Sequence, residues 1–201
     1  STTTLDMQAD SKLQRVNTIG TEAFKGSNLT SIVFPNSLKE IGEGAFSGTK
    51  LTGGVKFNTA SNVVFGKEAF YFSDIESVHL PYTTEISRSM FSHCYHLKEV
   101  IFGKVGVISN GAFHSCHALT QVGLRGSGVK ELGEVAFSNC TALTKVFLPA
   151  SVEKIGNFAF GYCRSLQSIT IDALNPPTLG DDIFFGLNAD QIPNIYVPAI
   201  S

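Results

Sequence analysis

The sequence lacks the features that mark several common functional classes. Charged residues make up only 16% of its 201 residues, and the formal net charge is -2. No basic field is therefore present to neutralise a phosphate backbone, and we expect no nucleic acid partner. No apolar run approaches the roughly 18 residues of a membrane span. The first residues also lack the positive start and the apolar stretch of a signal peptide.

Motifs that carry catalysis are missing as well. The chain contains no Gly-x-Ser-x-Gly sequence, no paired glycines around a cysteine, and no acid-base pair that the repeats would bring into one pocket. The glycine-rich stretch Gly123–Gly128 is not followed by a helix and an acidic residue at the spacing of a nucleotide-binding motif. We therefore predict that the chain is not an enzyme and that it has no cofactor.

What the sequence does contain is a period of 21 to 24 residues. Eight phenylalanines mark it, each within a phrase whose clearest copy runs from Ile155 to Leu166. A unit of this length cannot bury its own apolar face and must pack against copies of itself, which predicts a solenoid. The marking residues are Phe24, Phe46, Phe70, Phe91, Phe113, Phe137, Phe160 and Phe184.

The pattern within each repeat predicts a turn followed by a strand. An apolar residue stands five positions before each phenylalanine and is followed by glycine or serine, which suits a bend with little room for a side chain or with a positive φ. Ile155, Phe160 and Leu166 belong to a series of apolar positions three to five residues apart, which fits one or two helical turns. Beyond Leu166, the alternation of Ile169 and Ile171 predicts one short strand per repeat.

The full phrase, Ile-Gly-x-x-Ala-Phe-x-x-Cys-x-x-Leu-x-x-Val-x-Leu-Pro, resembles the leucine-rich repeat superfamily and specifically its BspA-like branch, over about residues 16 to 198. The resemblance implies an α/β solenoid, a right-handed leucine-rich repeat superhelix of about eight repeats. It implies one short parallel strand per repeat on the concave side and short helical or 3₁₀ turns on the convex side. Departures near Phe91, Phe184 and Leu51–Val55 predict local irregularity and not a different fold.

The repeats run on without a proline- or serine-rich linker, so we expect one elongated domain over residues 1–201. In this interpretation residues 1–15 are a degenerate N-terminal half-repeat. Residues 176–201 are an irregular last repeat that we expect to be truncated, because terminal repeats normally carry a polar cap.

Four cysteines form a ladder, because each stands three residues after its phenylalanine: Cys94, Cys116, Cys140 and Cys163. The equivalent positions elsewhere hold small or apolar residues, so we expect buried, reduced thiols. An even number of cysteines in an exported protein favours disulfides instead, and successive repeats come within the necessary Cα separation.

Histidines flank two of these cysteines, in His93-Cys94-Tyr95-His96 and His114-Ser115-Cys116-His117. Imidazole and thiolate groups are zinc ligands, and neighbouring repeats could supply both. If the cysteines point inward and the histidines outward, however, no single point is reached by all of them. We predict no metal site, with zinc as the alternative.

The outward positions of the strands form the most plausible working surface. Exposed apolar and aromatic side chains beside charged ones are typical of protein-binding patches, although single exposed apolar residues are common on strands. The candidate ligand-binding residues are Val33, Lys56, His79, Glu99, Ile101, Arg125, Lys145, Phe147, Thr170 and Tyr196.

These observations predict a non-catalytic recognition module that binds another protein through the concave sheet. The family resemblance implies an extracellular or cell-surface location and a host or extracellular-matrix protein as the partner. We expect the chain to be monomeric. The alternative is a passive stalk, a spacer within a larger surface protein.

Overall fold

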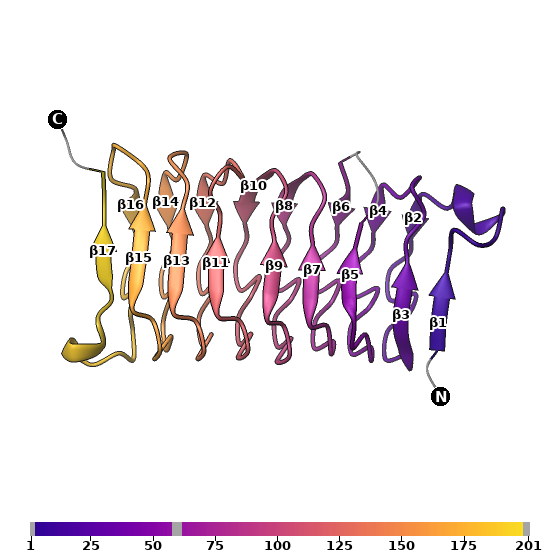
Figure 1. Ribbon diagram of the computed structural model, residues 1–201, viewed down its shortest axis with the longest axis horizontal. Coiled ribbons are helices and arrows are strands. Elements are labelled where there is room, and N and C mark those ends of the chain that lie inside the picture. Colours follow the sequence, from indigo (N-terminus) through magenta and orange to yellow (C-terminus); the bar gives the residue numbers. More distant parts are fainter. Residues whose placement is uncertain (1–2, 58–61, 199–201) are drawn as a thin grey trace.

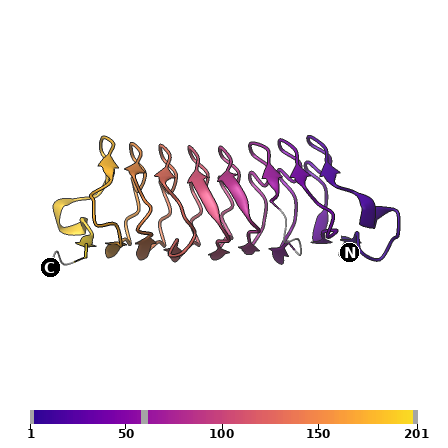
Figure 2. The same cartoon turned by 90° about the horizontal axis from the view of Figure 1, so that it is seen from above.

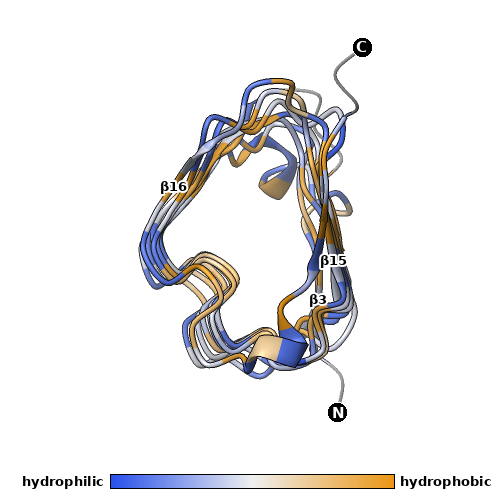
Figure 3. Ribbon diagram, turned by 90° about the vertical axis from the view of Figure 1, so that its left-hand side faces the viewer, coloured by the Kyte–Doolittle hydropathy of each residue, from blue (hydrophilic) through white to orange (hydrophobic). Residues whose placement is uncertain are grey.

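The chain winds into a right-handed solenoid of parallel strands, as the repeat predicts (Figures 1 and 3). This computed structural model describes residues 3–57 and 62–198. The coils stack along one axis, with the N-terminus at one end and the C-terminus at the other (Figures 1 and 2). Residues 1–2 and 199–201, the ends of the predicted domain, lie outside the described residues.

One side of the stack carries the odd-numbered strands, which are the longer strands in most coils, and we refer to it as the long-strand face. Its strands pair in parallel in three sheets, β1-β3, β5-β7-β9 and β11-β13-β15-β17. Their bounds are β1 (Thr3–Asp6), β3 (Leu29–Val33), β5 (Gly54–Lys56), β7 (Ser77–His79), β9 (Glu99–Ile101), β11 (Gln121–Gly123), β13 (Lys145–Leu148), β15 (Ser168–Ile171) and β17 (Asn194–Tyr196).

The opposite side carries a second row of parallel strands, most of them two residues long, in the sheets β2-β4-β6 and β8-β10-β12-β14-β16 (Figure 3). They are β2 (Thr18–Ile19), β4 (Glu40–Ile41), β6 (Val64–Phe65), β8 (Thr83–Ile86), β10 (Val105–Ile108), β12 (Glu131–Leu132), β14 (Lys154–Ile155) and β16 (Thr178–Leu179). The sequence predicted only the strands of the long-strand face. The described residues contain two helical segments, the 3₁₀ helices η1 (Leu13–Arg15) and η2 (Ala189–Gln191).

The predicted helical turns around the phenylalanines are not confirmed. In every coil the residues two before and two after the phenylalanine have a positive φ, between 49° and 77°, which interrupts any helix. The N–H groups of Val135, Phe137 and Asn139 donate to carbonyl groups of the next coil at 2.7 to 2.9 Å, while the N–H groups between them bond three residues back. The turns are thus linked from coil to coil by their own hydrogen bonds.

The marking phenylalanines form a continuous stack through the core. From Phe24 to Phe160 successive ring centroids lie 5.1 to 5.8 Å apart, with interplanar angles of 1° to 11°. Phe46 and its equivalents up to Phe160 have no exposed area. Near-parallel rings at this separation are offset stacks, a favourable aromatic geometry. The last step, to Phe184, widens to 6.4 Å and 24°.

The glycine after the inner apolar residue is required by close packing between coils. A Cβ atom on Gly133 would lie 2.6 Å from the backbone nitrogen of Asn110, and one on Gly66 would lie 2.3 Å from that of Glu43. Neither glycine has a positive φ. Of the two reasons that the sequence left open, lack of room is the correct one.

The cysteine ladder consists of four free thiols without exposed area, which confirms the prediction of buried thiols. Each Sγ donates a hydrogen bond of 3.0 to 3.2 Å to the carbonyl oxygen of the phenylalanine in the preceding coil. Burial raises the pKa of Cys94 and of Cys163 to about 12 and those of Cys116 and Cys140 well above their ordinary value. The thiols are therefore protonated at neutral pH.

Candidate functional site

Backbone pairing brings the candidate residues of the long-strand face into two aligned groups. Lys56, His79 and Ile101 are neighbours in β5, β7 and β9. Phe147, Thr170 and Tyr196 are likewise neighbours in β13, β15 and β17. The ladder is interrupted between β9 and β11 and also between β3, which carries Val33, and β5.

The same strands set how far each side chain is exposed. Ile101 and Tyr196 keep 45% and 56% of their area exposed, respectively. Val33, His79, Phe147 and Thr170 are half-buried, whereas Lys56, Glu99, Arg125 and Lys145 are exposed. The candidate residues of the long-strand face therefore form a strip of apolar surface flanked by charges of both signs.

Arg125 is held in place by two residues from different coils. Its Nε and Nη2 donate to the two carboxylate oxygens of Asp172 at 2.8 and 3.0 Å. Its guanidinium carbon lies 4.9 Å from the centroid of the Phe147 ring. The hydrogen bonds from Arg125 to Asp172 raise the pKa of Arg125 further. The two hydrogen bonds and the contact with the ring hold the long Arg125 side chain in one orientation. Its positive charge is thereby fixed over the Phe147 ring.

Sequence reasoning identified Arg125 and Phe147 but missed Asp172. Asp172 and Arg125 both occupy the position directly after the last inward residue of their strands, two coils apart. Their opposite charges at equivalent repeat positions were the one available signal. It was weak, because the ion pair spans the coil that lies between them.

The histidines near the cysteine ladder lie outside the core, whereas the cysteines point into it. The rings of His93 and His114 lie 5.4 Å apart, and His117 stacks on Tyr95 at 4.8 Å. Burial lowers the pKa of His93 and of His114. Within residues 3–57 and 62–198, no group of three or more histidine, cysteine or acidic side chains is arranged to hold a metal ion.

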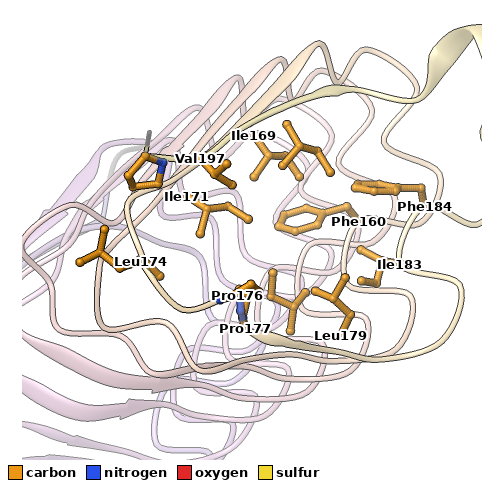
Figure 4. A pocket seen from close by; sticks show the side chains of 14 residues that line it. Phe160, Ile169, Ile171, Leu174, Pro176, Pro177, Leu179, Ile183, Phe184 and Val197 are labelled. Carbon is orange, nitrogen blue, oxygen red and sulfur yellow. The ribbon is translucent and has the colours of Figure 1, made fainter. Parts of the chain in front are cut away.

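An apolar pocket of about 310 Å³ lies at the C-terminal end of the stack (Figure 4). Phe160, Ile171 and Leu179 are among its lining residues, all of which are apolar. The pocket continues the core that lies between the two strand rows. None of the helices in the described part of the chain has the length and apolar character needed to span a bilayer.

A family model described as "BspA type Leucine rich repeat region (6 copies)" matches residues 8–120 and 84–199. No curated protein matches the chain.

Among solved structures, a leucine rich cell surface protein from Faecalibacterium prausnitzii A2-165 is 21% identical with a TM-score of 0.45, over 94% of this chain and 61% of that one. A leucine-rich repeat protein from Eubacterium ventriosum ATCC 27560 is 20% identical with a TM-score of 0.44, over 79% and 52%. A leucine-rich repeat protein from Bacteroides ovatus ATCC 8483 is 20% identical with a TM-score of 0.33, over 92% and 76%. The chain thus spans less than two thirds of the length of the first two.

Proposed function

Because the chain belongs to the BspA-type leucine-rich repeat family, we propose that it is a non-catalytic recognition module that binds another protein along its long-strand face. The partner is a host or extracellular-matrix protein, and the module acts outside the cell or at its surface as a monomer. The observation that carries the proposal is the pair of aligned groups on this face, one ending at Ile101 and the other containing Phe147 and Tyr196, with Arg125 fixed over Phe147.

Two physical features of the strip favour binding. The strands that present it are tied to their neighbours by continuous parallel pairing within each sheet, so little conformational entropy is lost when a partner docks. Arg125 is already held by Asp172 and Phe147, and a planar guanidinium with a fixed orientation is a typical binding hot spot. Exposed rings such as Tyr196 add apolar area at low entropic cost.

The test replaces the three apolar side chains together, as Ile101→Ser, Phe147→Ser and Tyr196→Ser. Binding of the intact chain and of the variant to a panel of purified extracellular-matrix proteins is measured by surface plasmon resonance. We expect the variant to lose at least about tenfold in affinity for any protein that the intact chain binds. Phe72→Ser, which changes an exposed aromatic residue on the turn after β6, on another side of the solenoid, is the matched control.

Circular dichroism of the triple variant checks that the fold is retained. Binding that survives the triple change with the fold intact removes the long-strand face as the site. Absence of binding by the intact chain supports the alternative, a passive spacer within a larger surface protein.

A further inference from the structure

A second group of aromatic side chains, those of Phe158, Tyr162 and Phe185, lies on the turns that follow β14 and β16. The Phe185 ring is 5.5 Å from that of Phe158 and 5.4 Å from that of Tyr162, at 84° and 86°. The Tyr162 ring lies directly over Gly186, where a Cβ atom would come within 2.4 Å of it. The three rings therefore form a wall whose orientation is fixed by edge-to-face contacts and by the glycine.

This wall borders an open hollow of about 490 Å³, which we call the turn-edge hollow. Asn139 and His114 lie among the residues that line it, together with Ser138 and Gly161. The repeat position of Gly161 is occupied by Tyr71, His114 and Phe185 in three other coils. The missing side chain at this coil leaves room beside the aromatic wall.

The polar groups of the hollow have unused hydrogen-bonding capacity. Asn139 Nδ2 donates to Ser115 Oγ at 3.0 Å and to His117 Nε2 at 3.1 Å, which fixes the amide. Asn139 Oδ1, Ser138 Oγ and the Tyr162 hydroxyl make no hydrogen bond to another described residue. A ligand can therefore donate to Asn139 and can exchange hydrogen bonds with the two hydroxyl groups.

The charge of the hollow narrows the class of ligand. No lysine, arginine, aspartate or glutamate lines it, and burial lowers the pKa of His114. A charged ligand would lose its hydration without a counter-charge, and a wholly apolar one would cover Asn139 and the hydroxyl groups without bonding to them. Aromatic faces carry partial negative charge, so they attract the C–H groups of a ring that bears hydroxyls at its edge.

We propose that the turn-edge hollow, bounded by Phe158, Tyr162 and Phe185 and by Asn139, binds a short neutral saccharide. The sugar's C–H face packs on the aromatic wall, and its hydroxyl groups bond to Asn139 and to the hydroxyls of Tyr162 and Ser138. The volume lies in the range of small-molecule sites. The site is separate from the long-strand face, so it goes beyond the proposed protein-binding function.

The test titrates the full chain by calorimetry with cellohexaose, maltohexaose and chitohexaose, and with an oligogalacturonate as the acidic counterpart. We expect at least one neutral oligosaccharide to bind and the acidic one to bind at least about tenfold more weakly. Tyr162→Ser combined with Phe185→Ser should weaken neutral binding at least about tenfold, whereas Tyr162→Phe, which removes only the hydroxyl, should weaken it less.

Phe72→Ser, at the repeat position of Tyr162 in another coil, is the matched control and should leave saccharide binding unchanged. A proline-rich peptide is included, because such peptides also dock on aromatic grooves. Binding of that peptide without any saccharide, no saccharide binding at all, or binding that the double variant retains would each overturn the proposal. None of these results depends on whether the long-strand face binds a protein.

Discussion

At the scale of single residues, contacts between coils set the backbone conformation of the turns more strongly than local preference does. Among the residues that the structure describes, eleven other than glycine have a positive φ, all of them two positions before or after a marking phenylalanine. The glycines that follow the inner apolar residue, apart from Gly20, serve close packing instead. Glycine occupies these left-handed positions in only some coils, so the sequence could not locate them from glycine alone.

Val135 is the most strained of these residues, because it is β-branched and has a φ of 49°. We expect Val135→Gly to raise the free energy of unfolding by about 0.5 to 1 kcal/mol, since relief of strain outweighs the entropy that glycine loses on folding. Urea denaturation measures the change. Val107→Gly, at a half-buried strand position without a positive φ, should lower the free energy of unfolding. A loss of stability in Val135→Gly would contradict the strain argument.

The cysteine ladder leads to a second prediction at this scale. Thiolate is the reactive form, and burial keeps the pKa of Cys94 and Cys163 at about 12. Iodoacetamide at pH 8 should therefore modify none of the four thiols in the folded chain and all four in urea, as counted by mass spectrometry of the intact protein. Rapid modification of any one of them under native conditions would show that the ladder is open to solvent.

At the scale of elements, the sequence predicted strands where apolar alternation covers several residues and missed strands where it does not. β15 buries Ile169 and Ile171 on alternate positions, which is a readable pattern. β12 has only two residues, of which Leu132 alone is buried. Such a strand exists because its neighbours in the stack pair with it, and pairing partners one period away leave no local signal.

The spacing of these coils should be sensitive to a single methyl group. We expect Gly133→Ala to lower the free energy of unfolding by about 1 to 3 kcal/mol, because its Cβ would lie 2.6 Å from the backbone of the preceding coil. Gly123→Ala is the matched control, since a Cβ at Gly123 meets nothing within 4 Å. Equal effects of the two substitutions, measured by thermal unfolding, would show that the coils can move apart at little cost.

At the scale of the whole molecule, the period alone was enough to predict a solenoid whose repeats pack against one another, because a repeated phrase constrains every coil in the same way. The candidate strip on the long-strand face remains a proposal, as does the single domain over residues 1–201. The ion pair from Arg125 to Asp172 and the turn-edge hollow depend on what differs between coils. The repeat pattern describes only what the coils have in common, so the sequence analysis did not predict either feature.

Unequal hydrogen bonding along the stack leads to the last prediction. The N–H groups of Phe158, Phe160 and Tyr162 donate to carbonyl groups of the following coil at 2.7 to 3.0 Å. The equivalent N–H groups of Asp182, Phe184 and Gly186 have no such partner among the described residues. Amide hydrogen exchange followed by NMR should therefore be slow at the first three positions and fast at the second three, because exchange requires an amide that is not hydrogen-bonded.

Similar protection at both sets would mean that another group covers the last turn, by self-association for example. Repeating the measurement at several protein concentrations would separate that case, because protection by a second copy falls on dilution.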